Sequence, residues 1–153
     1  MKAFVTLLIL AFGVSVCHMK ITKLSPSDRK TLEDESLFAV VKSPKELPKP
    51  VLDLCADHKG RIAAPGEPFS VGCSITDSSP PSNRLIWAMC SADKKSFVIH
   101  YETGGIVHGF HVRFILLTDE KTAQDKGRAD VQKPLKDYKA FLSALKENKS
   151  DDH

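Results

Sequence analysis

Apolar residues alternate with polar or small residues over several short stretches of the chain, which is the pattern of strands that bury one face. The clearest case runs from Phe69 to Thr76, where every second residue is apolar and Cys73 falls on the buried side. A shorter apolar stretch precedes it, and three more follow close together as a meander. The pattern predicts five strands, at 51–55, 69–76, 84–90, 96–102 and 106–117.

Helical spacing of apolar residues is found towards both ends of the chain. Ser25 is a suitable N-cap, with proline at the next position and Asp28 three residues after the cap, which predicts a helix that continues to about Val41. Pro134 opens a second helix with one apolar stripe. The stripe consists of Leu135, Tyr138, Phe141, Leu142 and Leu145. We expect this amphipathic helix to pack on one face of the sheet.

Two stretches have neither period. Residues 43–50 contain three prolines and are expected to be extended, and residues 118–133 contain almost nothing to bury and are expected to be loop or frayed helix. The chain divides into an N-terminal helix with a proline-rich linker (18–50), a sheet core (51–117), and a polar linker, C-terminal helix and disordered tail (118–153). The predicted fold class is α+β. A small antiparallel sheet of four or five strands, with a meander over 84–117, carries the C-terminal helix on one face and a less firmly docked N-terminal helix.

Residues 1–17 have the composition of a secretory signal peptide. An early lysine precedes an apolar run that is too short to cross roughly 30 Å of hydrocarbon as a helix, and small residues end the stretch. We expect cleavage after Cys17 and secretion to the extracellular space, or to the periplasm of a bacterium. A lipoprotein anchored at Cys17 is the alternative, which the bulky Val16 disfavours. In a eukaryotic host, Asn148 would begin a glycosylation acceptor, Asn-Lys-Ser.

The charge balance limits the expected partners. Without the leader, 21 of the 22 lysines and arginines remain against 19 acidic residues, a net charge of +2. A binder of nucleic acid or of an anionic membrane favours a basic face, and the sequence has no such excess. We therefore expect no nucleic acid as a partner, and instead an extracellular protein or a small ligand. We also expect a monomer without a membrane span.

Cleavage leaves three cysteines, Cys55, Cys73 and Cys90. In an oxidising compartment two of them are expected to form a disulfide bond. We favour Cys55 with Cys73 or Cys90, because such a bridge would close a loop over the sheet. The third cysteine is then buried, reactive, or available to link two chains as a covalent dimer. No two cysteines lie at the short spacing of a zinc site.

The two glycines at 104–105 predict a tight hairpin turn. With these glycines as the turn residues, His100 pairs with Gly109, and the register decides which side chains share a face. The predicted core face carries Phe97, Ile99, Tyr101, His108, Phe110, Val112 and Phe114. The opposite face gathers His100, Glu102 and His111 around Gly109, which has no side chain to fill the space between them.

His100, Glu102 and His111 are the candidate site. Two imidazoles and a carboxylate are suitable ligands for a divalent metal, most simply zinc. They equally suit a general base with an orienting acid, because histidine titrates near physiological pH. The third interpretation is a solvent-facing sheet surface without chemistry, because no spacing here is specific to a mechanism.

Two functions are compatible with these features. Secretion, small size, balanced charge and the lack of a recognised catalytic motif favour a small extracellular binding or effector protein, without a cofactor, that uses the exposed face and loops of the meander. The alternative is a metal-dependent or His-based hydrolase that uses His100, Glu102 and His111. His108, on the core side, is expected to be a neutral histidine bonded to a neighbour.

Overall fold

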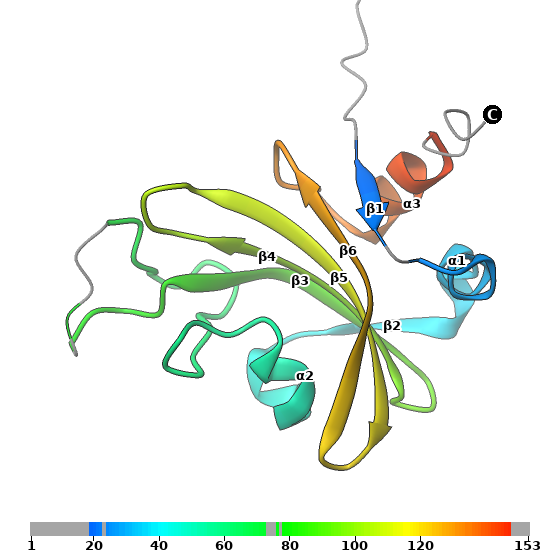
Figure 1. Ribbon diagram of the computed structural model, residues 1–153, viewed down its shortest axis with the longest axis horizontal. Helices are drawn as coiled ribbons and strands as arrows, with labels where there is room; N and C mark the ends of the chain where they lie inside the picture. Colours follow the sequence, from blue (N-terminus) through cyan, green and yellow to red (C-terminus); the bar gives the residue numbers. More distant parts are fainter. Residues whose placement is uncertain (1–18, 23, 73–75, 77, 148–153) are drawn as a thin grey trace, which may run out of the picture.

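The computed structural model of the protein describes residues 19–22, 24–72, 76 and 78–147. Its centre is one antiparallel sheet of six strands in the order β1-β6-β5-β4-β3-β2 (Figure 1). The strands are β1 (Lys20–Thr22), β2 (Phe38–Val41), β3 (Asn83–Ser91), β4 (Ser96–Thr103), β5 (Gly109–Asp119) and β6 (Thr122–Val131). The helices are α1 (Pro26–Glu33), α2 (Lys49–Asp53) and α3 (Tyr138–Glu147), with short 3-10 helices η1 (Glu35–Leu37) and η2 (Pro44–Glu46). The predicted α+β class is confirmed, with a larger sheet than expected.

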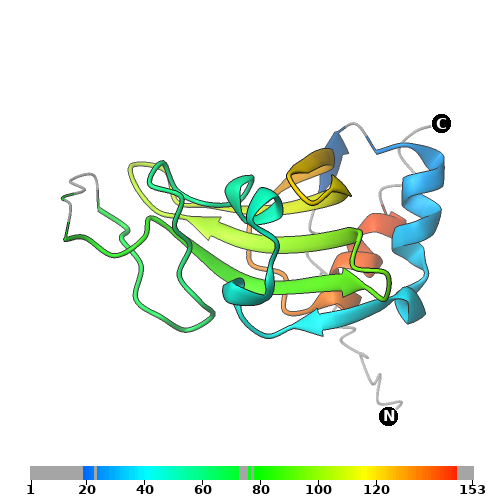
Figure 2. The same cartoon turned by 90° about the horizontal axis from the view of Figure 1, so that it is seen from below.

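A hydrophobic core lies on each face of the sheet, with α1 and α3 on one side and α2 on the other (Figures 1 and 2). On the side of α1 and α3 the core includes Leu32, Val98, Val112, Phe114, Phe141 and Leu145. On the side of α2 it includes Val51, Cys55, Leu85, Phe97, Ile99 and Ile115. Strand β4 lies inside the sheet, and six of its eight residues are buried. Because neither face of such a strand contacts solvent, alternation in its sequence does not identify an exposed face.

The N-terminal helix begins where the sequence predicts but is shorter, because it ends at Glu33. Ser25 caps it by accepting a hydrogen bond from the Asp28 N–H at 3.1 Å. After η1 the chain enters β2, whose aromatic and β-branched residues suit a strand. The Phe38 ring packs against the Tyr138 ring of α3, with centroids 5.5 Å apart. Pairing with β3 and the contact with Tyr138 stabilise residues 38–41 as a strand, so the helix does not continue through them.

Two of the predicted strands are not strands. Residues 51–55 belong to α2 and its end, because the prolines just before them place the chain in the first turn of a helix, where a missing N–H is tolerated. Residues 69–72 and 76 belong to no strand. The remaining positions of the predicted strand, 73–75, include Cys73 and lie outside the described residues.

Strand β6 lies within residues 118–133, which were predicted from the sequence to be loop or frayed helix. Its buried positions include small residues, Gly127 and Ala129, which give little hydrophobic signal. A Cβ at Gly127 would lie 3.2 Å from the Ile21 side chain, so glycine lets β1 lie close to β6. The interpretation of 118–133 as unstructured was therefore wrong, because small residues can form a packed strand.

The predicted amphipathic C-terminal helix is present as α3. Its buried residues are Tyr138, Phe141, Leu142, Ala144 and Leu145. The Tyr138 hydroxyl donates a hydrogen bond to the Leu32 carbonyl at 2.7 Å, which joins α3 to α1. Among the described residues, no helix has the length and apolar content that a membrane crossing requires.

The β4–β5 hairpin has a longer loop than predicted. Residues 104–108 form the loop, so that Thr103 pairs with Gly109 and Tyr101 with His111. A two-residue turn would have paired Thr103 with Ile106 instead. The observed partner lies three residues further along, and an odd shift moves the side chains of one strand to the opposite face. The predicted register was therefore wrong.

Candidate functional site

His100 is fully buried and joins three parts of the fold. Its Nδ1 donates a hydrogen bond to the His111 carbonyl oxygen at 2.9 Å, and its Nε2 accepts one from the Leu135 N–H at 3.0 Å. Burial lowers the pKa of His100, and the hydrogen bond to His111 and the charge of Glu102 offset only part of this effect. The ring is neutral and both nitrogens are occupied. His100 therefore holds the structure together and has no lone pair to offer a metal or a substrate.

Glu102 is buried on the same face and contacts the side chains of Arg84 and His108. Its Oε1 accepts hydrogen bonds from Arg84, with Nη2 at 2.7 Å and Nε at 2.8 Å. Its Oε2 lies 2.7 Å from the Nε2 of His108. The prediction placed His108 in the core, but it is an exposed residue of the β4–β5 loop. These contacts tie the loop to β3 and β4 and leave Glu102 with no free oxygen for a metal.

Two aromatic rings complete this support. The guanidinium of Arg84 lies over the Phe69 ring, 4.2 Å from its centroid. The His108 ring lies 4.8 Å from the Phe110 ring and 5.9 Å from the Phe69 ring. Since Phe69 belongs to the long loop before β3, the cluster joins that loop to the β4–β5 hairpin.

His111 lies on the opposite face of the sheet from His100 and Glu102. Its Nδ1 is 2.6 Å from Asp130 Oδ1 on β6, and its Nε2 is 3.0 Å from Thr103 Oγ1 on β4. Arg128 Nη2 also lies 3.2 Å from Nδ1, and it can only donate. In the tautomer that satisfies the shorter contact with Asp130, Nδ1 carries the proton and Nε2 accepts the Thr103 hydroxyl proton. The three side chains form a line of hydroxyl, imidazole and carboxylate across three strands.

The Asp130 carboxylate is ionised in this arrangement. Partial burial acts to raise the pKa of Asp130, but the hydrogen bond from His111 and the charge of Arg128 outweigh it, so the pKa is lowered. Gly109 lies beside the other end of the line, where a Cβ would be 3.1 Å from His111 Nε2. Glycine thus leaves space next to the atom that would take a proton.

The predicted set of His100, Glu102 and His111 therefore does not converge. In the described ranges, no group of three or more histidine, cysteine, aspartate or glutamate residues is placed to hold a metal ion. Of the three, only His111 lies in an arrangement that can move a proton. Thr103 and Asp130 were not predicted from the sequence, and Asp130 was missed because its strand was taken for a loop.

The cysteines differ from the prediction too. Cys55 and Cys90 are free thiols, so the predicted bond between them is absent, and Cys73 lies outside the described residues. Burial raises the pKa of Cys55 to about 12 and also raises the pKa of Cys90. Neither thiol is activated as a nucleophile. Asn148 also lies outside the described residues.

A second feature is the hydrophobic tip, which we define as Val71, Ile106 and Val107. Their exposed fractions are 59%, 87% and 78%. The two segments touch, because a Cβ at Gly104 would lie 1.9 Å from the Ser70 carbonyl oxygen. The tip is therefore one surface built from two loops.

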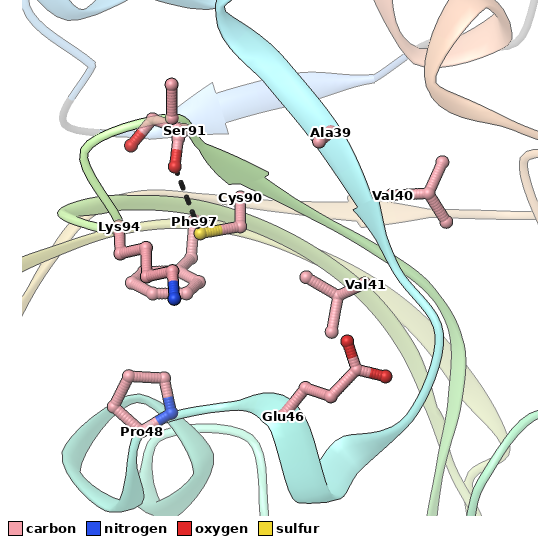
Figure 3. A pocket seen from close by; sticks show the side chains of 10 residues that line it. Ala39, Val40, Val41, Glu46, Pro48, Cys90, Ser91, Lys94 and Phe97 are labelled. Carbon is pink, nitrogen blue, oxygen red and sulfur yellow. Dashed lines mark hydrogen bonds between the residues drawn. The ribbon is translucent and has the colours of Figure 1, made fainter.

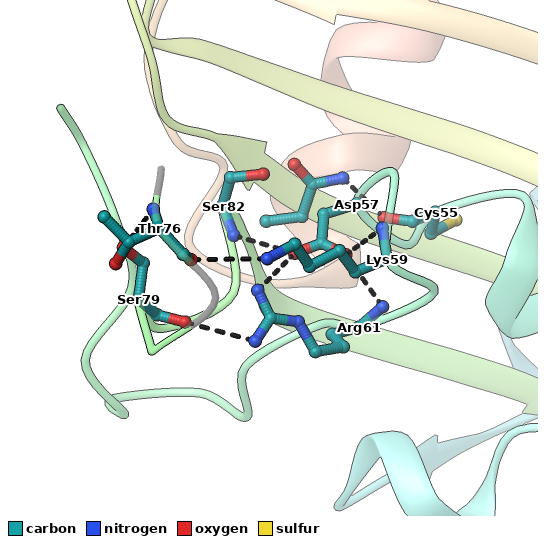
Figure 4. A network of polar contacts seen from close by, with 8 residues as sticks. Cys55, Asp57, Lys59, Arg61, Thr76, Ser79 and Ser82 are labelled. Atoms are coloured by element: carbon teal, nitrogen blue, oxygen red, sulfur yellow. Dashed lines mark hydrogen bonds and ion pairs between the residues drawn. The ribbon is translucent and has the colours of Figure 1, made fainter. Parts of the chain in front are cut away.

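The loop that carries Val71 is anchored by a buried carboxylate (Figure 4). Asp57 accepts hydrogen bonds from the backbone N–H groups of Lys59, Arg61 and Ser82 at 2.8, 3.0 and 3.2 Å. Burial acts to raise the pKa of Asp57, but these bonds and the Arg61 charge outweigh it and lower the pKa. Ser70 in turn donates its N–H to the Pro81 carbonyl at 2.9 Å. These bonds hold the base of the loop in one conformation.

No family model matches the chain, and neither the curated proteins nor the solved structures contain a match.

Proposed function

We propose that the protein is secreted and acts as an extracellular binding protein whose contact surface is the hydrophobic tip. The observation that carries this proposal is the gathering of exposed apolar side chains. Of the five large hydrophobic side chains exposed among the described residues, three form the tip. Exposed apolar groups that cluster in this way are typical of interaction sites.

The support beneath the tip favours the same function. The contact between Glu102 and His108 fixes the β4–β5 loop, and the Asp57 hydrogen bonds fix the neighbouring loop. A contact surface that is already ordered loses less conformational entropy when a partner binds. The tip thus combines apolar contact area with a rigid base, as a protein partner requires.

The double substitution I106S/V107S is expected to abolish binding of the partner. Immobilised mature protein should capture a specific protein from the fluid around the producing cells, identified by mass spectrometry. With the purified partner, the substitution should raise the Kd by at least about 100-fold, because truncated central apolar contacts dominate binding energies. Calorimetry measures both affinities.

V40S is the matched control, since Val40 is also exposed but belongs to β2. It should leave the Kd for the partner unchanged. Equal capture by the wild-type protein and by I106S/V107S would contradict the proposal, as would the absence of any specific partner.

A second candidate function, a His-based hydrolase, rests on the line of Thr103, His111 and Asp130. In this order of hydrogen bonds, a histidine can take the proton of a hydroxyl that attacks a carbonyl carbon, while the carboxylate holds the ring. The proton then passes from Nε2 to the leaving alcohol, and water releases the acyl group from Thr103. Activated esters are the substrate class on which such a hydroxyl, imidazole and carboxylate act most readily.

Hydrolysis of p-nitrophenyl acetate tests this candidate. T103A and H111Q are each expected to lower the rate by at least about 100-fold, the usual contribution of a positioned base. H58A is the control, because His58 is an exposed imidazole on another part of the chain and any free histidine hydrolyses this ester slowly. If T103A and H111Q hydrolyse the ester as fast as H58A does, the hydrolase is excluded.

A further inference from the structure

Among the strands of the described residues, β2 has β3 as its only neighbour and so forms a free edge of the sheet. The Ala92 N–H donates to the Leu37 carbonyl at 3.2 Å, which extends the register of β2 with β3. In an antiparallel ladder the bonded positions alternate, so Ala39 points its backbone groups at β3 while Phe38 and Val40 point theirs outwards.

The outward groups of β2 are largely unpaired. The Phe38 N–H bonds to the Glu35 carbonyl at the end of η1. Within the described residues, no hydrogen bond engages the Phe38 carbonyl or the N–H and carbonyl of Val40. The strand Phe38–Val41 also has no charge, proline or bulge, the features by which edge strands avoid pairing with another chain. The edge is therefore ready to accept a further strand.

Cavities lie on both sides of this edge. One, of about 520 Å³, opens towards α2 and is lined by Val41, Glu46 and Phe97 (Figure 3). The other, of about 460 Å³, opens towards α3 and is lined by Trp87 and Met89, among others. Val40 belongs to both linings, and its side chain is 65% exposed. A strand added to β2 would find space for the side chains of both of its faces.

The charges that flank β2 indicate which strand fits. Asp34 and Glu35 precede the strand, whereas Lys42, Lys45 and Glu46 follow it and give that end a net positive charge; all five are exposed. No ion pair within the described part of the chain engages Glu35, Lys42 or Lys45. When two copies meet antiparallel, the acidic end of each lies beside the basic end of the other, whereas a parallel arrangement would place like charges together.

We propose that two copies of this chain pair antiparallel through β2, so that their sheets become one continuous sheet about a twofold axis at Val40. In this register each Val40 N–H donates to the Val40 carbonyl of the second copy. Each Lys42 N–H donates to the Phe38 carbonyl of the second copy, so all the unpaired carbonyl groups are used. The contact is isologous and closes, as expected of a dimer with twofold symmetry. It is separate from the hydrophobic tip and does not depend on it.

Sedimentation equilibrium of the wild-type protein tests the dimer. The wild type should sediment as a dimer, and V40K should raise the dimer Kd by at least about 100-fold, because the two lysines would meet at the axis. V107K places the same charge on an exposed valine of the tip and should remain a dimer. A wild-type monomer at every soluble concentration, or equal loss of dimer in both variants, would overturn the proposal.

A charge exchange tests the orientation and does not rely on V40K being folded. In this register Glu35 lies opposite Lys45 of the second copy, so E35K and K45E should each weaken the dimer, and the double variant E35K/K45E should restore it. Amide exchange should also show the backbone N–H at position 40 protected in the wild-type dimer and unprotected in V40K. Additive weakening in the double variant would overturn the antiparallel arrangement, and binding of the tip partner by V40K would show that failure here leaves the proposed function standing.

Discussion

Replacement of His100 by alanine is expected to lower the free energy of unfolding by about 4 kcal/mol, the largest effect of any single substitution discussed for this protein. The change leaves the buried Leu135 N–H and the His111 carbonyl without their partner and opens a cavity between the sheet and α3. Each buried unsatisfied group costs about 1–3 kcal/mol, and a cavity of this kind adds more. Urea unfolding followed by circular dichroism measures the loss.

The same residue makes stability depend on pH. Burial lowers the pKa of His100 in the folded state, whereas the unfolded chain has the ordinary value near 6.5. Below that pH the unfolded state binds more protons, so stability should fall as pH decreases, with a limiting slope of about 1.4 kcal/mol per pH unit, and should be constant above it. H100Q cannot titrate and should lose this component. Wild-type and H100Q curves that run parallel between pH 7 and pH 5 would contradict the neutral, buried histidine.

Gly104→Ala is expected to have the second largest effect and to divide the hydrophobic tip. The new Cβ would lie 1.9 Å from the Ser70 carbonyl oxygen and 2.8 Å from its carbonyl carbon. Backbone atoms cannot turn away as a flexible side chain can, so the loop that carries Val71 must separate from β4. We expect a loss of about 2–3 kcal/mol, typical of forced overpacking, and a weaker affinity for the tip partner.

Gly72→Ala is the matched control, because it lies on the same loop and its Cβ would meet no atom within 4 Å. Thermal unfolding gives the stability of both variants, and limited proteolysis reports the freed loop. Similar stability and similar cleavage of the two variants would show that the two loops do not touch at Gly104.

Much of the sheet and α3 could be predicted because their residues follow a simple period. The apolar residues of β3 and β4 mark both segments as strands, and the apolar stripe of α3 shows the buried side of that helix directly. The prediction failed where packing depends on something else. Gly127 and Ala129 make β6 a strand through small size, and the prolines before α2 start a helix in a segment that reads as a strand.

The candidate site was predicted only in part, because the strand register decides which side chains meet. His111 was identified, but its partners Thr103 and Asp130 come from strands whose register the sequence does not determine. His100 was placed on a solvent-facing side because alternation implies one wet face, and a strand inside a sheet covered on both faces has none. The length of one hairpin loop decided which of these histidines could act together.

Trp87 gives this protein an optical signal that requires no label. It is the only tryptophan, its indole N–H donates to the Leu135 carbonyl at 2.9 Å, and its ring lies 5.2 Å from that of His100. Its emission therefore reports on whether the segment before α3 is docked on the sheet. Since only an imidazolium quenches indole fluorescence in this way and the folded His100 is neutral, the emission should stay constant on acidification until this segment leaves the sheet or the protein unfolds.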